Sequence, residues 1–485
     1  MCYPPKPLTT HTGVGGGNQM VELICAALSA TLFYFSQGLD DTWLLTWFAP
    51  VPLLWLAFGN TPAWRLTAAS FVAFLVGQIY ILQCYGDAPP WAILLLFGLR
   101  PLLFPLAVIF SRVIQRRCAP AFALLAFPLC WTAMDYIASL LSPHGSLGST
   151  AYSQVSTPIV LQSASLLGMY SVTFVLSLFA SALALVARVG RTAFVAAGAG
   201  LVLCALDLAF GATRLLAPQL PVVRVAAVAD MSLLASEHRA DDLNVNVKGA
   251  SVFASAAQDL AGRGATLIVT PEESMVTRRA WHAEVFAPLQ AASRQTGAEI
   301  VAGFLEVAPP GDIAVAFAKD KNWQLYAKRH LLLPIEARYT PGTESGILGA
   351  GIAMAICKDM DFPDTIRKDA RHGITLMAVP AWDFGADGWL HGRMAIMRGV
   401  ENGFAIVRAA SNGLLTASDA QGRLVAKKVV SPDHMDWILA DLSPGPGPTF
   451  YTAVGDVLPQ ASLVLTFVLG GFAFRRRWRQ ANYRS

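Results

Sequence analysis

Long apolar runs fill the first half of the chain, and one more lies near its end. A helix that crosses a bilayer needs roughly 20 mainly apolar residues, and these runs are close to that length. Because consecutive runs lack a polar face, the pattern favours membrane-spanning helices over the buried helices of a soluble protein. The runs cover residues 20–38, 43–59, 66–83, 91–110, 121–141, 159–187, 192–211 and 458–474.

The pattern changes after residue 218, where short apolar runs begin to alternate with polar stretches. The polar stretches 243–262 and 279–297 have the composition of helices, whereas the apolar runs are rich in β-branched residues and indicate strands. Strands and helices in alternation are typical of a layered α/β domain. The predicted strands lie at 222–228, 266–269, 300–304, 351–356, 374–379 and 405–409.

These patterns divide the chain into five parts. We predict an N-terminal tail over 1–19, a membrane domain of about seven helices over 20–215, and an α/β domain over 220–445. A closing transmembrane helix over 458–474 and a basic tail over 475–485 complete the chain.

Composition agrees with a membrane protein. Of the 485 residues, 54% are hydrophobic and only 14% are charged, and the mean hydropathy is +0.48. An ordinary soluble protein of this length is less apolar. The net charge of +4 is small and indicates no surface for nucleic acid.

The positions of the arginines predict the orientation in the membrane. Lys and Arg collect on the cytoplasmic side of membrane proteins. Loop 142–158 has neither residue, so we place it outside, and this puts domain 220–445 outside as well. The segments placed inside carry Arg65, Arg112, Arg116, Arg117, Arg188, Arg191, Arg475, Arg476, Arg477 and Arg479.

Three segments of the α/β domain end an apolar run with a reactive side chain. Glu272 follows the run at 266–271, Lys328 lies in 326–336, and Cys357 follows 351–356. Covalent catalysis at an acyl carbon needs a nucleophile, a base and a positive charge for the oxyanion. Among the seven cysteines, only Cys357 lies outside the apolar half of the chain, and their spacing predicts neither a zinc site nor a disulfide framework. This chemistry requires no metal or organic cofactor.

The same segments resemble the Glu-Lys-Cys triad of the nitrilase superfamily, in the order found there. The resemblance is carried by Pro-Glu at 271–272, Lys-x-His-Leu at 328–331 and Ile-Cys-x-Asp at 356–359. Residues 398–402 and 411–413 also resemble the late helix and strand of that superfamily. The implied fold is an α-β-β-α sandwich beside an α-helical membrane bundle.

The membrane half resembles the bacterial apolipoprotein N-acyltransferases, in segments 49–55, 148–154 and 167–174. Those enzymes have the same layout of a membrane bundle, a nitrilase domain and one closing helix. The resemblance implies a multi-pass protein of the bacterial inner membrane with its catalytic domain on the periplasmic face. It also implies a phospholipid acyl donor and a lipoprotein acceptor, and we expect a monomer.

By this resemblance, Cys357 is the nucleophile that carries the acyl chain as a thioester. Glu272 is the general base and later the acid, and Lys328 steadies the oxyanion together with the backbone N–H of Lys358. Glu336 holds Lys328 or Glu272 in place. Asp359 follows the nucleophile as a further supporting residue.

Other functions remain open. The segment between Lys328 and Cys357 is short, and Lys358-Asp359 is closer to soluble amidase-like relatives, which favours a membrane-tethered amidase with the same triad. A non-catalytic scaffold or transporter is disfavoured because all three triad residue types are present.

Several polar residues have more than one interpretation. Arg398 and Glu401 lie one helical turn apart and predict a structural ion pair, and His330 is interpreted as a packing residue. Trp382, Asp383 and His391 either line the pocket entrance or pack within a loop, and loop packing is favoured. Charged side chains within spans are costly in lipid, which makes functional candidates of Arg100, Asp135 and Asp207.

Overall fold

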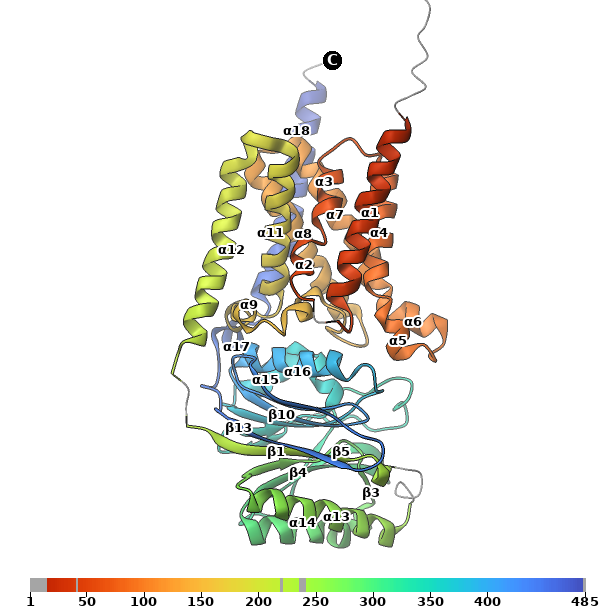
Figure 1. The fold of residues 1–485 in the computed structure, drawn as a ribbon, viewed down its shortest axis with the longest axis vertical. Helices are drawn as coiled ribbons and strands as arrows, with labels where there is room; N and C mark the ends of the chain where they lie inside the picture. The colour runs from red at the N-terminus through yellow and green to blue at the C-terminus, as the bar shows by residue number, and fades with distance from the viewer. Residues whose placement is uncertain (1–14, 41, 219–220, 235–240, 483–485) are drawn as a thin grey trace, which may run out of the picture.

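The computed structural model describes residues 15–40, 42–218, 221–234 and 241–482, and it has two parts (Figure 1). A helix bundle is joined end to end with an α/β domain. Helix α1 begins, and helix α18 ends, at the end of the bundle that is farther from the α/β domain (Figure 1). Residues 1–14 of the predicted tail 1–19 lie outside the described residues. Helix α1 begins at Gly15, within the predicted tail.

Long helices build the bundle, and short ones connect them. By length and composition, four segments of the described chain are suited to cross a membrane: 19–37, 120–141, 170–215 and 457–475. The long helices are α1 (Gly15–Gln37), α4 (Ala63–Gly77), α7 (Leu99–Arg117), α8 (Pro120–Leu141), α11 (Tyr170–Val189), α12 (Phe194–Leu215) and α18 (Val457–Asn482). The short helices are α2 (Leu45–Phe48), α3 (Val51–Ala57), α5 (Tyr80–Tyr85), α6 (Pro90–Phe97), α9 (Pro158–Leu161), α10 (Ala164–Leu167) and α17 (Phe450–Val454).

Four of the predicted spans are interrupted: the run 66–83 is divided into α4 and α5 at residues 78–79, and the other three are divided at a helix-breaking residue. Proline lacks the N–H that would bond four residues back, and its ring clashes there. The run 43–59 is divided into α2 and α3 before Pro52, and the run 91–110 is divided into α6 and α7 before Pro101. In the run 159–187, Gly168 adopts a φ of 76° that ends α10, and α11 begins two residues later.

The α/β domain contains two sheets. The first has the order β13 (Met435–Leu442), β1 (Val223–Asp230), β2 (Leu267–Val269), β4 (Glu299–Val307), β5 (Pro310–Phe317) and β6 (Gln324–Ala327), with β3 (Met275–Thr277) beside β4. The second has the order β12 (Leu424–Val429), β11 (Leu414–Ser418), β10 (Ala405–Ser411), β9 (Leu376–Trp382), β8 (Ile352–Met354) and β7 (Ile347–Gly349). Neighbours β1, β2 and β4 are parallel, as are β8, β9 and β10.

Helices cover the outer face of each sheet, and apolar side chains of both sheets pack between them. Helices α13 (Leu243–Gly262) and α14 (His282–Thr296) cover the first sheet, and α15 (Pro363–Ala370) and α16 (Gly388–Asn402) cover the second (Figure 1). This arrangement confirms the predicted α-β-β-α sandwich. The short 3-10 helices are η1 (Thr150–Gln154), η2 (Gly190–Ala193), η3 (Ser232–Leu234), η4 (Arg279–Trp281) and η5 (Cys357–Asp361).

Helix α16 belongs to both parts of the molecule. Its Met394 and Val400 pack in the core of the bundle, whereas Ala395 packs against the second sheet. The guanidinium of Arg398 lies 3.1 Å from the carboxylate of Glu401, and both side chains are fully buried, which confirms the predicted ion pair. This helix layer lies between the bundle and the sheets (Figure 1), so the α/β domain is packed directly onto the membrane half.

Candidate active site

Cys357 begins the tight turn η5 immediately after the second sheet's strand β8 and Ala355-Ile356. Its φ is 38°, a left-handed conformation that costs a residue with a side chain roughly 1–2 kcal/mol. The buried carboxylate of Asp359 stabilises the turn, because it accepts hydrogen bonds from the N–H groups of Ile356 (3.1 Å), Arg329 (3.2 Å) and His330 (2.9 Å). The strained turn is therefore fixed from the side of the α/β domain.

The ammonium group of Lys328 lies among three buried carboxyl groups. Its Nζ atom is 2.5 Å from Oε1 of Glu272, 2.6 Å from Oε1 of Glu336 and 3.1 Å from Oδ2 of Asp312. Burial alone would lower the pKa of Lys328, but the acidic groups around it, Glu272 first, raise it well above its usual value. Lys328 is consequently a permanent cation beside Glu272.

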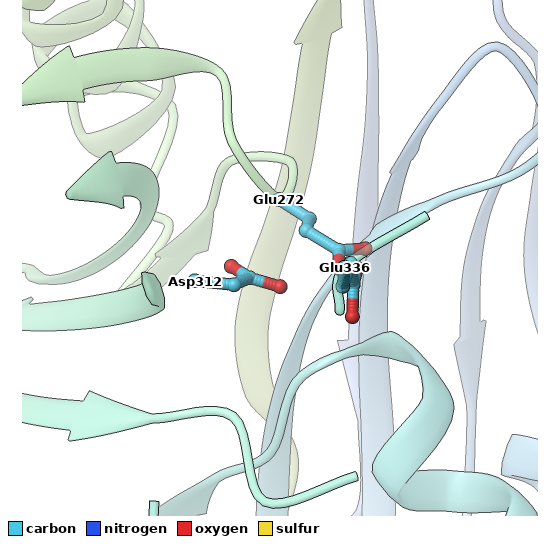
Figure 2. A group of neighbouring side chains, drawn as sticks. All are labelled: Glu272, Asp312 and Glu336. Atoms are coloured by element: carbon cyan, nitrogen blue, oxygen red, sulfur yellow. The ribbon is translucent and has the colours of Figure 1, made fainter. Parts of the chain in front are cut away.

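The same three carboxyl groups are spaced as metal ligands would be (Figure 2). Oxygen ligands of this kind suit divalent cations. Lys328, however, is within ion-pairing distance of all three groups, so its ammonium already supplies positive charge to the set. The cluster fits a protein-borne cation better than a metal.

Glu272 follows strand β2 and is 2% exposed. Burial raises the pKa of its carboxyl group, but Lys328, Asp312 and Cys357 together lower the pKa below its ordinary value. One oxygen accepts a hydrogen bond from Lys328, whereas Oε2 has no hydrogen-bond partner among the residues that the structure describes. The group is thus an ionised carboxylate with one oxygen available to take a proton.

In contrast to the ionised carboxylate of Glu272, the thiol of Cys357 keeps its proton. Burial and the charge of Glu272 raise its pKa well above the usual value, although Lys328 and Arg408 oppose this. The thiol lies 3.4 Å from the carbonyl oxygen of Trp382. At neutral pH the site therefore holds a protonated thiol beside an ionised carboxylate that could accept its proton.

A cavity of about 310 Å³ opens onto these groups, and both parts of the molecule line it. Apolar side chains line it beside charged ones, as a site for a lipid with a polar head would require. Tyr85 and His144 come from the membrane half. The remaining lining residues are Glu272, Glu273, Lys328, Leu332, Ile335, Glu336, Arg338, Tyr339, Cys357, Lys358, Asp361, Trp382, Phe384 and His391.

Polar contacts of His144 and Tyr85 join the halves at the cavity wall. Nζ of Lys358 lies 2.8 Å from Nδ1 of His144, whose pKa is lowered to about 4 by burial and by the charge of Lys358. The hydroxyl of Tyr85 donates to Asp387 at 2.8 Å and lies 3.2 Å from Nε2 of His391. The membrane half thus contributes part of the wall of the site.

Comparisons with known proteins cover both parts of the chain. Residues 29–182 match the family described as the apolipoprotein N-acyltransferase N-terminal domain, and residues 224–432 match the carbon-nitrogen hydrolase family. An apolipoprotein N-acyltransferase of Geobacter metallireducens is 24% identical over 94% of this chain and 96% of its own. The chain belongs to the apolipoprotein N-acyltransferase family.

Other similar proteins align with parts of the chain. The apolipoprotein N-acyltransferase of Haemophilus influenzae is 31% identical over 25% of this chain and 24% of its own. Among solved structures, an amidase from Nesterenkonia sp. is 21% identical, with a TM-score of 0.40, over 48% of this chain and 92% of its own. The N-acyltransferase N-terminal match lies over the helix bundle, so this family includes the membrane half as well as the sandwich.

The structure brings together Glu272, Lys328, Glu336 and Cys357, although they come from three separate segments. Lys358 lines the same cavity, and Asp359 lies behind the turn. His330 stacks on Phe362 with ring centroids 3.7 Å apart, as the packing interpretation predicted.

Trp382 and His391 line the cavity, although the sequence favours loop packing for both. Asp383 is paired with the buried Arg408.

Sequence reasoning missed Asp312 and His144. Asp312 is a single acidic residue in the otherwise apolar strand β5. A buried charge needs a partner, so this pattern is a signal that could have identified Asp312. His144 is the only His, Lys, Arg, Asp or Glu in the loop 142–158. Its position beside Lys358 depends on how the two halves pack, for which the sequence carries no local signal.

Proposed function

We propose that this chain transfers a fatty acyl chain from a membrane phospholipid to the α-amine of the N-terminal diacylglyceryl-cysteine of lipoproteins. The observation that carries the proposal is the cavity around Cys357, which is lined by the triad residues and by Tyr85 and His144 of the membrane half. A site built this way lies where a lipid substrate can reach the thiol without leaving the membrane.

In the first half-reaction, the sulfur of Cys357 attacks the ester carbonyl of the phospholipid. Oε2 of Glu272, the unpartnered oxygen, takes the thiol proton. The negative charge on the former carbonyl oxygen is stabilised by Lys328 and by the backbone N–H of Lys358. The tetrahedral intermediate then collapses: the C–O bond breaks, Glu272 returns the proton to the leaving oxygen, and a lysophospholipid departs from an acyl thioester.

In the second half-reaction, the α-amine of the lipoprotein attacks the thioester carbonyl. Glu272 takes a proton from the attacking nitrogen, and the same groups stabilise the oxyanion. The C–S bond then breaks, the sulfur regains its proton from Glu272, and the amide product leaves. Glu336 and Asp312 keep the ammonium of Lys328 in position throughout both steps.

The orientation and compartment are also part of the proposal. The arginine distribution supports a bundle whose end near the start of α1 faces the cytoplasm. The α/β domain then lies on the periplasmic face of the inner membrane. A single chain supplies every residue named in the reaction, which supports a monomeric enzyme.

A carbon-nitrogen hydrolase with the same triad is the second candidate, because the thioester could also react with water. The match of residues 29–182 to the N-acyltransferase N-terminal domain favours the acyltransferase. The two reactions differ in the product of the second step, which is an N-acyl amide for the transferase and a free carboxylic acid for the hydrolase.

The test uses the full-length chain in detergent, with a phospholipid donor carrying a labelled acyl chain and a diacylated lipopeptide acceptor. The expected result is a labelled triacylated lipopeptide, identified by mass spectrometry, and an acyl adduct on Cys357 when the acceptor is omitted. Labelled free fatty acid with no acylated peptide would instead establish the hydrolase.

Cys357→Ala is the catalytic control, and it should abolish both the adduct and the product. An adduct that persists in this variant would refute the assignment of the nucleophile. In cells, the gene should restore lipoprotein triacylation to a strain that lacks its own N-acyltransferase, whereas failure of this rescue with a stably expressed chain would contradict the proposed acceptor.

A further inference from the structure

The loop that follows helix α8 contacts the turn that carries the nucleophile. The N–H and Oγ of Ser146 both donate to the carbonyl oxygen of Asp361, at 2.9 and 2.7 Å. Asp361 is the last residue of η5, whose first residue is Cys357. Gly145 has a φ of 50°, and a Cβ atom there would lie 2.4 Å from the same oxygen, so only glycine permits this approach.

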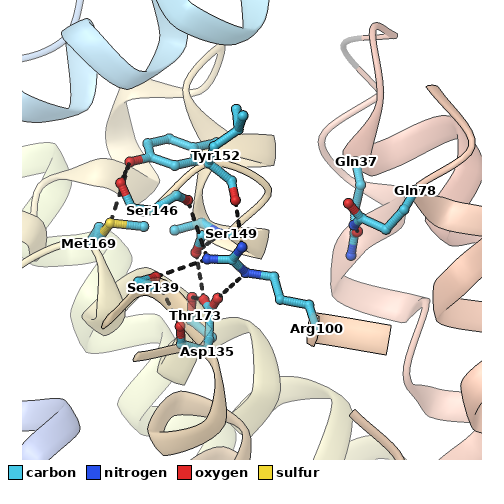
Figure 3. Close-up of polar contacts among 12 residues, drawn as sticks. Gln37, Gln78, Arg100, Asp135, Ser139, Ser146, Ser149, Tyr152, Met169 and Thr173 are labelled. Atoms are coloured by element: carbon cyan, nitrogen blue, oxygen red, sulfur yellow. Dashed lines mark hydrogen bonds and ion pairs between the residues drawn. The ribbon is translucent and has the colours of Figure 1, made fainter. Parts of the chain in front are cut away.

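A buried arginine of the membrane half holds this loop. Arg100 lies near the start of α7 and is 4% exposed. Its guanidinium donates to the carbonyl oxygens of Leu147 at 2.5 Å and Ser146 at 3.5 Å, and to Oγ of Ser139 at 2.9 Å (Figure 3). Two loop carbonyls are thereby fixed by one rigid planar group.

Asp135 of helix α8 holds the arginine in turn. Oδ1 accepts from Nε of Arg100 at 2.8 Å, while Oδ2 accepts from Ser149 of the loop at 2.5 Å and from Thr173 of α11 at 3.2 Å (Figure 3). The carboxylate is fully buried. Burying an ion pair costs several kcal/mol per ion before its contacts compensate. Here the compensating contacts include groups of the loop.

We infer that Arg100 and Asp135 are positioning residues for Cys357 that act through the loop 142–149. A left-handed φ at a residue with a side chain persists only where its surroundings enforce it. Asp359 holds the turn η5 from the α/β domain, and Ser146 holds its far end from the membrane half. The membrane half therefore helps to position the thiol, in addition to anchoring the α/β domain.

The inference rests on the proposed role of Cys357 as nucleophile, but it does not depend on which acceptor the enzyme uses. It is tested by alkylating the purified full-length chain with iodoacetamide over a range of pH. The peptide that contains Cys357 is followed by mass spectrometry, which separates this thiol from the other cysteines. No lipid or lipoprotein enters the assay, so failure of the proposed function would leave the result unaffected.

Arg100→Met and Asp135→Asn are expected to slow this alkylation by about 10²-fold, the effect of a misplacement of roughly 1 Å at a reacting group. Ser146→Ala removes one of the two hydrogen bonds to Asp361 and should slow it roughly tenfold. Arg100→Lys keeps the charge but not the planar fork, so it should restore only part of the rate. The shape of the pH profile should also change, because the thiol moves relative to Glu272.

Arg112→Met is the matched control, since Arg112 is a buried arginine of the same helix whose Nη1 has no hydrogen-bond partner in the described part of the chain. It should leave the alkylation rate within twofold. The inference is overturned if Arg100→Met, with an unchanged melting temperature, alkylates like the parent. If Arg100→Met does not fold, Ser146→Ala decides, and an unchanged rate in that variant overturns the inference equally.

Discussion

Oδ2 of Asp312 lies 3.1 Å from Nζ of Lys328, inside the cluster that also contains the proposed general base Glu272. Asp312 is 1% exposed, and burial followed by the charge of Glu272 raises the pKa of its carboxyl group well above the usual value. We therefore expect Asp312 to keep its proton at neutral pH. That proton would keep a further negative charge away from Lys328 and leave Glu272 as the ionised member of the pair Glu272–Asp312.

Asp312→Asn should be tolerated, because an amide is neutral and nearly the same size as the protonated acid. We expect acyl transfer within about threefold of the parent, since the change replaces one neutral hydrogen-bonding group by another. Asp312→Leu removes the polar group beside Lys328 and should lose far more. The measurement is the rate of thioester formation on Cys357. A large loss in Asp312→Asn would show that the native group is ionised.

Lys328→Met should destabilise the fold as well as abolish acyl transfer. Removing one partner of a buried ion pair leaves uncompensated charge and costs about 3–5 kcal/mol. Three buried carboxyl groups, Glu272, Asp312 and Glu336, would then face one another without a cation.

The measurement for Lys328→Met is thermal unfolding in detergent. Lys248→Met on the exposed side of α13 is the matched control and should melt like the parent. An unchanged melting temperature for Lys328→Met would contradict the picture of a charge-balanced cluster.

The sequence contained the triad but not the way in which it is held. Glu272, Lys328 and Cys357 each end a recognisable apolar run, so residue type and order were enough to predict the α/β fold and the candidates. Asp312 lies within a strand, and only its pairing across the sheet places it beside Lys328. The predicted spans at 43–59 and 91–110 were interrupted because apolar composition indicates a span even where a proline ends the helix.

Contacts between the halves were the least predictable part. Arg100 and Asp135 were selected because charges inside spans are costly, yet their sequence separation reveals neither the pairing nor the loop that they hold. Helix α16 reads as an ordinary covering helix, although its opposite faces belong to two cores. These features depend on packing between segments distant in the chain, and a single sequence carries no local pattern for them.

His391 should make stability depend on pH above neutrality. Burial lowers its pKa, but the carboxylates of Asp361 and Asp387 raise it to about 10, from 6.5. The folded state thus binds the proton more tightly than the unfolded state. The stabilisation is fully present below pH 6.5 and is lost as the pH rises toward 10.

Thermal unfolding across this pH window should therefore show a melting temperature that falls more steeply for the parent than for His391→Gln. The exposed His434 offers a matched control, and His434→Gln should retain the slope of the parent. If the parent and His391→Gln lose stability in parallel, the ring is not charged in the folded state.

The left-handed turn at Cys357 predicts an unusual order of stability among its variants. Glycine adopts this conformation without the penalty that alanine incurs, so Cys357→Gly should be more stable than Cys357→Ala by about 1 kcal/mol. Cys130, a buried cysteine within helix α8, is the matched control. There the order should reverse, because glycine is less favourable than alanine in a helix by about 1 kcal/mol. Melting temperatures of the four variants provide the comparison. If glycine were the less stable replacement at both positions, the turn would carry no strain, and the argument that two halves of the molecule must hold it would fail with it.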